Sequence, residues 1–182
     1  CGWRRAVPQS LSSAGRMRRA LPARDATPAA FAPYGWVVQA TEDGAPFDAK
    51  TEPALAGFGA AGAAPPRFYV MRLPARGLAS DRITHHKAVT QTLGGLGDRP
   101  WFLVVAAPTG GNPPGPLTAF RVPAQTFIVL KAGTWHAGPL FDGETEGEKH
   151  GERDFFNAEL ADTNVVDHTT HVFEGGPVEV VP

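Results

Sequence analysis

Trp101-Phe102-Leu103-Val104-Val105-Ala106 is the most continuous apolar stretch of this 182-residue chain. A strand that is apolar at successive positions is buried on both faces, so this stretch is predicted to be a central strand. Shorter segments with strand character lie on either side of it and are separated by glycine-rich turns, one of them predicted at Gly94-Gly95 with Gly97-Asp98. The expected strands are 36–39, 67–73, 83–89, 101–106, 117–122, 126–130, 135–141, 154–160, 168–173 and 178–181.

The content of glycine and proline supports an all-β fold. The chain has 21 glycines and 18 prolines, which leave little room for long helices. One helical turn is expected at 27–32, where Thr27 can cap the first turn and Pro28 follows it. Many short strands without a long helix are typical of a jelly-roll barrel. In such a barrel we expect functional polar groups to converge at the mouth.

Charge is distributed unevenly along the chain. Residues 1–24 carry six arginines and no acid, which leaves 11 basic and all 18 acidic residues for the remainder. An acidic body argues against nucleic acid as a partner, and no apolar run approaches the roughly 18 residues of a membrane span. The single cysteine, Cys1, can form neither an internal disulfide nor a cysteine metal site.

The arginine-rich head resembles part of a transit peptide for a chloroplast or mitochondrion. We therefore expect residues 1–26 to form a basic extended arm and residues 27–182 to form the barrel domain. An isolated segment with few large apolar groups is mobile unless it is bound, so residues 1–24 are expected to dock on a protein partner.

Two segments place histidines where a barrel can bring them together. In the first, His85 and His86 are adjacent, so only one of them points inward on a strand and the other is expected in solvent. In the second, a turn glycine is followed by a strand that can point His136 into the barrel. Imidazoles titrate near neutral pH and are suited to proton transfer.

These segments resemble the two halves of the cupin motif and, more narrowly, the ureidoglycolate lyase (or ureidoglycolate hydrolase) family, in particular its plant and algal branch. The resemblance covers roughly residues 27 to 182 and excludes the basic head. It rests on Phe31-Ala32-Pro33-Tyr34-Gly35, on Thr84-His85-His86 with Thr90-Gln91, on Phe127 through Gly133-Thr134-Trp135-His136, and on Asp154-Phe155-Phe156-Asn157 through Asn164-Val165-Val166-Asp167-His168.

The resemblance implies a cupin-type double-stranded β-helix and a lyase of allantoin degradation that splits ureidoglycolate into glyoxylate and urea. We expect His86, His136 and Glu159 to be catalytic. An arginine can clamp a carboxylate bidentately, and Arg72 matches an arginine of the family, so it is expected to bind the anionic substrate. The other expected substrate contacts are Gln91, Trp135 and Asn157.

The general cupin pattern has metal ligands that this chain lacks. Thr84 and Gln91 stand where that pattern has a histidine and a carboxylate. Two imidazoles and a neutral amide include no anionic ligand, so we expect no tightly bound metal and no other cofactor. A weakly bound divalent ion would use His86, His136 and Gln91.

Each assignment has a structural alternative. His86 and His136 can be hydrogen-bonded core residues, Glu159 can face water, and Arg72 can pair with a surface acid. Gln91 can satisfy backbone groups, and Trp135 can lie in the floor of the barrel instead of stacking on substrate. The segment 167–171 looks like part of a catalytic triad, but its two histidines fall on opposite faces of a strand, which favours a structural role.

A second class of function is also open. The chain can be a catalytically silent cupin that serves as an accessory subunit of an organellar complex, docked through its basic arm. Cupins commonly pair through their sheets, so a homodimer is expected by analogy with that fold.

Overall fold

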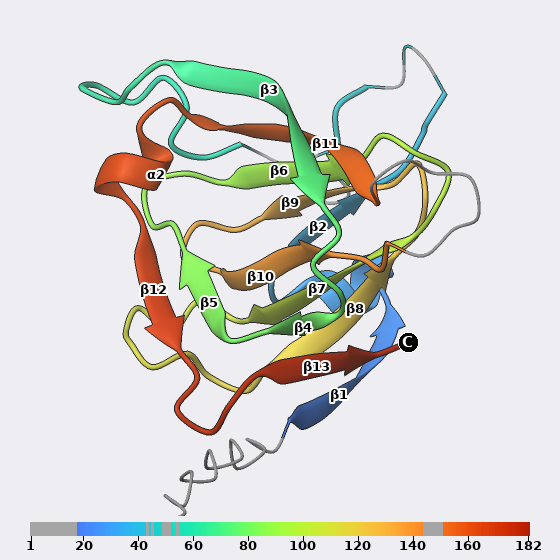
Figure 1. The fold of residues 1–182 in the computed structure, drawn as a ribbon. Helices are drawn as coiled ribbons and strands as arrows, with labels where there is room; N and C mark the ends of the chain where they lie inside the picture. Colours follow the sequence, from blue (N-terminus) through green and yellow to red (C-terminus); the bar gives the residue numbers. More distant parts are fainter. Residues whose placement is uncertain (1–17, 43, 45, 49–51, 54, 144–150) are drawn as a thin grey trace, which may run out of the picture.

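A computed structural model describes residues 18–42, 44, 46–48, 52–53, 55–143 and 151–182. In this part of the chain, strands dominate and the two helices are single turns (Figure 1). The elements are β1 (Arg19–Asp25), α1 (Pro28–Phe31), β2 (Gly35–Val38), β3 (Pro66–Pro74), β4 (Ala79–Ser80), β5 (Arg82–His85), β6 (Gln91–Gly95), β7 (Trp101–Ala106), β8 (Thr118–Val122), β9 (Phe127–Leu130), β10 (Trp135–Leu140), β11 (Glu152–Leu160), α2 (Thr163–Val166), β12 (Thr169–Val172) and β13 (Val178–Val181).

The strands form two sheets that lie over each other as the layers of a curled half-barrel (Figure 1). One sheet has the order β12-β5-β10-β7-β8-β1-β13-β4, and the other has the order β2-β9-β6-β11-β3. The predicted all-β, cupin-type fold is therefore confirmed. Among the described residues, no helix is long and apolar enough to cross a membrane.

Strand β7 is central, as its sequence predicts. It lies between β10 and β8 and is antiparallel to both. Alternate side chains of β7 enter two different apolar clusters: Trp101, Leu103 and Val105 pack in one, and Val104 and Ala106 pack in the other. Because both faces of this strand are buried, its sequence is apolar at successive positions rather than at alternate ones.

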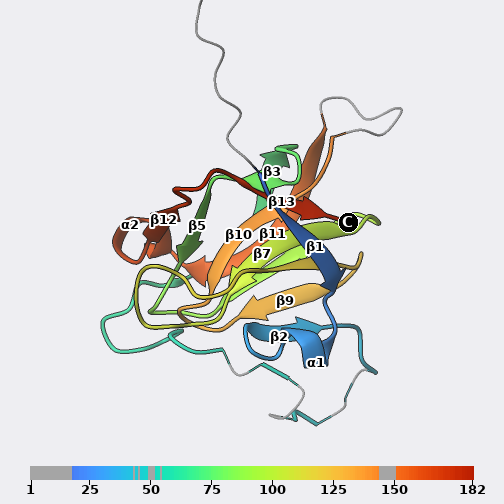
Figure 2. The ribbon, with the colours of Figure 1, turned by 90° about the horizontal axis from the view of Figure 1, so that it is seen from below.

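The first helical turn also follows the prediction. The side chain of Thr27 accepts a hydrogen bond from the backbone N–H of Ala30 at 3.2 Å, and Pro28 opens the turn. The turn places Phe31 in the core, where its ring meets the ring of Phe120 edge-on. Figure 2 shows α1 beside β2 at one margin of the molecule.

The described part of the basic head belongs to the barrel. Residues 19–25 form β1, which is parallel to β13 over one half and to β8 over the other (Figure 1). Arg18 forms an ion pair with Glu179 of β13 at 3.0 Å. The boundary expected at residue 26 is thus wrong for this strand, because its backbone completes the sheet. The rest of the expected arm, residues 1–17, lies outside the described residues.

Two strands differ from the prediction. The strand expected at 83–89 ends at His85, because the carboxylate of Asp167 accepts hydrogen bonds from the backbone N–H groups of Lys87 and Ala88 and fixes a turn there. Conversely, the predicted turn at Gly94 is part of β6. The ring of Phe127 lies where a side chain at Gly94 would lie, 2.3 Å from an ideal Cβ, so glycine lets the strands pack closely.

Candidate functional site

A cavity of about 470 Å³ lies between the two sheets. Strands β3, β6 and β11 of the five-stranded sheet line one side, and β4, β5 and β10 of the eight-stranded sheet line the other. Along β3 the lining residues are Tyr69, Met71 and Leu73, which are alternate positions of a strand. The cavity therefore extends along the strands, with amide and imidazole groups towards Tyr69 and two arginines beyond Leu73.

His86 and His136 lie side by side in this cavity, with ring centroids 5.3 Å apart. His136 is positioned by β10, which pairs it with Thr84 of β5, and His86 follows the last residue of β5. Both rings are buried. The fixed strand pairing thus brings together two residues that are far apart in the sequence.

Backbone carbonyls determine the tautomer of both rings. The Nδ1 of His86 donates to the carbonyl oxygen of Asp167 at 2.5 Å, and the Nδ1 of His136 donates to that of Thr134 at 3.2 Å. A carbonyl oxygen only accepts, so each neutral ring carries its proton on Nδ1. The Nε2 of each histidine is therefore the nitrogen with a lone pair, and it can accept a proton.

Burial keeps His136 uncharged at neutral pH. Removal from water, followed by the neighbouring His86, lowers the pKa of His136 to about 3. A third imidazole, His168, also lines the cavity, with its ring centroid 5.4 Å from that of His86. Burial and then His86 lower the pKa of His168 as well. Burial and the neighbouring His86 thus disfavour positive charge on His136 and on His168.

Glu159 is 1% exposed and is held by three neutral donors. Its Oε1 accepts hydrogen bonds from the Tyr69 hydroxyl at 3.1 Å and from the Asn164 amide at 3.0 Å, and its Oε2 accepts one from the Gln91 amide at 3.0 Å. Burial raises the pKa of Tyr69, so its hydroxyl stays protonated and can donate. The amide of Asn157 in turn donates to the oxygen of Tyr69 at 2.9 Å.

The structure brings together five of the residues expected in the site. His86, His136, Glu159, Gln91 and Asn157 all line the cavity. The expected alternation on β11 is present at Asn157 and Glu159, which both point to the inner face. This placement follows the sequence, but it does not by itself test the chemical roles that we expect for these side chains.

Arg72 and Trp135 do not reach the cavity. Arg72 lies on the outer face of β3, where its side chain is 68% exposed and forms two hydrogen bonds with Asp154 at 2.9 and 3.0 Å. The expectation that it converges with the histidines is wrong, because odd-numbered residues of β3 point inward. Trp135 is fully buried and stacks on His85 with ring centroids 4.0 Å apart. His85 is therefore buried rather than in solvent as expected.

Some residues of the cavity were missed by the sequence analysis. His168 was assigned to a strand, but β12 begins at Thr169, so His168 lies in the turn before it and alternation does not apply. Tyr69 could have been found by its position, since it is directly opposite Asn157 across the β3–β11 pair. Asn164 comes from α2, a single turn that carries no strong sequence signal.

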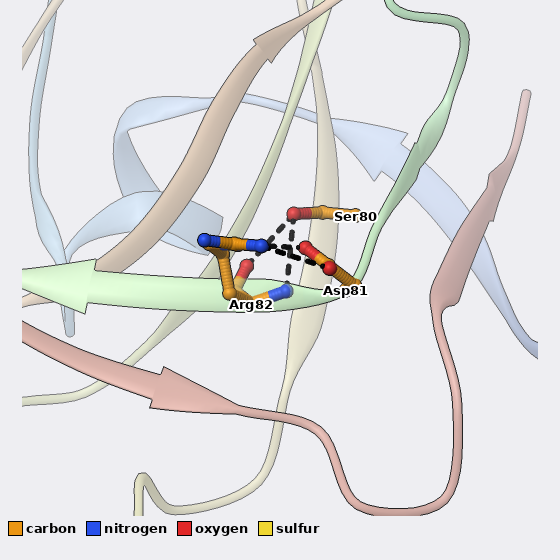
Figure 3. A network of polar contacts seen from close by, with 3 residues as sticks. All are labelled: Ser80, Asp81 and Arg82. Carbon is orange, nitrogen blue, oxygen red and sulfur yellow. Dashed lines mark hydrogen bonds and ion pairs between the residues drawn. The ribbon is translucent and has the colours of Figure 1, made fainter.

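Two arginines, Arg76 and Arg82, line the end of the cavity away from Glu159. Arg82 begins β5, and its guanidinium forms two hydrogen bonds with the neighbouring carboxylate of Asp81 at 2.8 and 3.0 Å (Figure 3). The hydroxyl of Ser80 donates to the Arg82 carbonyl at 2.8 Å and closes this turn. Arg76 is exposed and forms no ion pair within the described residues.

The side chains present fit a metal ion poorly. Within the described ranges, no group of three or more His, Cys, Asp or Glu side chains is placed to hold a metal. Both oxygens of Glu159 already accept hydrogen bonds, and the oxygen that remains on Gln91 is neutral. A divalent ion in this site would therefore lack the anionic ligand that usually offsets its charge.

A family model described as Ureidoglycolate lyase matches residues 18–147, which is more than two thirds of the chain. The match includes His86, Gln91 and His136, and it ends before Asn157 and Glu159. None of the curated proteins matches the chain.

Proposed function

Because the chain belongs to the ureidoglycolate lyase family, we propose that it splits ureidoglycolate into glyoxylate and urea. The observation that carries the proposal is the pair of adjacent imidazoles, His86 and His136, each with an Nε2 lone pair in a buried cavity. The reaction needs a group that accepts the proton of the carbinol hydroxyl and a group that protonates the departing nitrogen. A neutral imidazole can do both in turn.

His136 is proposed to carry the proton. Its Nε2 accepts the hydroxyl proton while the carbon–oxygen double bond of glyoxylate forms and the bond to the ureido nitrogen breaks. The imidazolium then gives the proton to that nitrogen, which leaves as urea. Burial and His86 make this imidazolium acidic, which favours the second transfer.

His86 is proposed to orient the reacting group. Its ring is fixed by the hydrogen bond from Nδ1 to the carbonyl of Asp167, so its Nε2 has a defined position beside His136. From there it can accept a hydrogen bond from the substrate N–H next to the carbinol carbon. Such a fixed acceptor reduces the loss of freedom that the substrate suffers in the transition state.

The arginine end of the cavity is proposed to bind the substrate carboxylate. Arg76 is the better candidate, because Arg82 is already paired with Asp81 and Arg76 has no such partner in the described part of the chain. A guanidinium matches a carboxylate with two parallel hydrogen bonds. In this arrangement the carboxylate lies towards the cavity mouth and the ureido group lies deeper, near Glu159.

The test is steady-state kinetics with ureidoglycolate, in which urea and glyoxylate are both measured. His136→Gln should lower kcat about 100-fold or more, the range expected for loss of a general acid–base. His171→Gln is the matched control: this histidine lies outside the cavity, bonded to Asn112, and its replacement should leave kcat unchanged. A His136→Gln enzyme with normal kcat would overturn the assigned role.

A wild-type protein that releases no urea, with or without added divalent ions, would overturn the proposed activity as a whole. The competing role, a silent cupin within an organellar assembly, would then take its place. The cavity of about 470 Å³ supports the enzyme in preference to that role, since a purely structural barrel has no need of buried imidazoles around an internal space.

A further inference from the structure

Two buried carbonyl oxygens of residues that line the cavity lack a hydrogen-bond partner within the described residues. They are Oε1 of Gln91 and Oδ1 of Asn157. Gln91 is 7% exposed and Asn157 is fully buried, and both side chains line the cavity. A buried acceptor without a donor is costly, and native proteins rarely leave one unless a ligand or water completes it.

Glu159 dictates the orientation of both amides. A carboxylate can only accept hydrogen bonds, so Gln91 must turn its NH₂ group towards Glu159 and its oxygen away. For the same reason the Tyr69 hydroxyl must donate to Glu159, and its oxygen is left to accept. Asn157 must then present its NH₂ group to Tyr69, which turns the Asn157 oxygen away as well. The carboxylate of Glu159 thus determines the orientation of both amides, and the oxygen of each amide remains without a hydrogen-bond donor.

We propose that these two oxygens bind the unsubstituted carbamoyl end of the substrate by accepting hydrogen bonds from its N–H groups. Glu159 is then a positioning residue, because it acts through the two amides. This inference rests on the proposed function and deepens it: the site selects a ligand that donates hydrogen bonds at its deep end. The product urea, which has only N–H donors around a single carbonyl, should bind there by itself.

The two ends of the cavity carry opposite chemistry. Gln91, Asn157 and Glu159 line one end, and the two guanidinium groups of Arg76 and Arg82 line the other. A carboxylate is attracted to the arginines and repelled by the two carbonyl oxygens and Glu159. The site therefore admits the substrate in one direction only, with the ureido group inward.

The experiment is equilibrium dialysis of the whole protein with radiolabelled urea, at concentrations well below those that denature proteins. Binding should saturate at one urea per chain. Unlabelled urea should displace the label, and tetramethylurea, which keeps the carbonyl but has no N–H group, should not. Equal displacement by both compounds, or no saturable binding, would overturn the inference.

Glu159→Gln tests the positioning role. The new carboxamide can donate as well as accept, so the amides of Gln91 and Asn157 are free to turn their NH₂ groups into the cavity. Urea binding should weaken about tenfold, the effect of losing one good hydrogen bond, and tetramethylurea should now compete. Asp154→Asn is the matched control, since it neutralises an exposed carboxylate of the same strand and should change neither result.

A merely structural role for Glu159 would weaken urea binding and would not let tetramethylurea compete, which would overturn the inference. Failure of the inference is distinct from failure of the proposed function. If ureidoglycolate is cleaved but urea and tetramethylurea bind alike, the inference is wrong and the lyase activity stands. If urea binds selectively but ureidoglycolate is not cleaved, the inferred urea site stands and the proposed lyase activity is wrong.

Discussion

Acidification from about pH 7.5 to about pH 5 should destabilise the folded protein by about 2 kcal/mol through His136 alone. The pKa of this side chain falls from 6.5 in water to about 3 in the fold, because the ring is buried and faces His86. Between these two pKa values the unfolded chain binds a proton at this position and the folded chain does not. Acid therefore favours the unfolded state.

The sign and size follow from proton linkage. A histidine with a lowered folded pKa contributes its full stability above the unfolded pKa, and this contribution is lost as the pH falls through 6.5 towards 3. In that window the free energy of unfolding falls by about 1.4 kcal/mol per pH unit for one group. From the unfolded pKa down to about pH 5, the loss is about 2 kcal/mol.

The assay is unfolding by guanidinium chloride at several pH values, for the wild type and for His136→Gln. Glutamine does not titrate, so the difference between the two proteins isolates this side chain. His85 and His168, whose pKa values are also lowered, are present in both proteins and cancel. The wild type should lose about 2 kcal/mol more than the variant on acidification. Parallel pH curves for the two proteins would refute the reasoning.

Three further predictions concern the site and the sheet that supports it. Glu159→Ala should lower the free energy of unfolding by about 3–5 kcal/mol, measured by guanidinium chloride denaturation. The reason is that Tyr69, Gln91 and Asn164 would each lose the buried carboxylate that accepts their hydrogen bond. Asp154→Ala, the control on the outer face of the same strand, should have little effect. Gly35→Ala should lower the melting temperature sharply in a thermal scan, since an added Cβ would lie 2.0 Å from the backbone oxygen of Val129 and prevent β2 from pairing with β9; an unchanged melting temperature would contradict this packing. Arg76→Ala should raise KM for ureidoglycolate about tenfold with little change in kcat, because it removes a contact that is equally strong in the ground state and the transition state. Arg72→Ala, the control, should change neither constant in steady-state kinetics. The opposite pattern would restore Arg72 as the residue that binds the substrate carboxylate.

The sequence was sufficient for the fold and for much of the site because local patterns carry that information. The apolar run at 101–106 marks a strand with two buried faces, and the alternation along β11 places Asn157 and Glu159 together. The two histidine segments could be combined because a barrel has a single interior. None of these steps requires the register between strands.

The errors arise where the register or the end of a strand decides the outcome. Arg72 is opposite Asp154 and Tyr69 is opposite Asn157, so the register of one strand pair determines which of them faces the cavity. His168 is in the cavity because β12 begins one residue after it. Gly94 of β6 is typical of a turn when the sequence is considered alone, because the ring that fills the space beside it comes from Phe127, on another strand.

The most direct test of the central claim is the identity of the products formed from ureidoglycolate by the purified wild-type protein. Cleavage of the carbon–nitrogen bond by the His86–His136 pair predicts urea and glyoxylate in equal amounts, with no ammonia. Release of ammonia, or the absence of both products, would show that these imidazoles do not perform the reaction proposed for them.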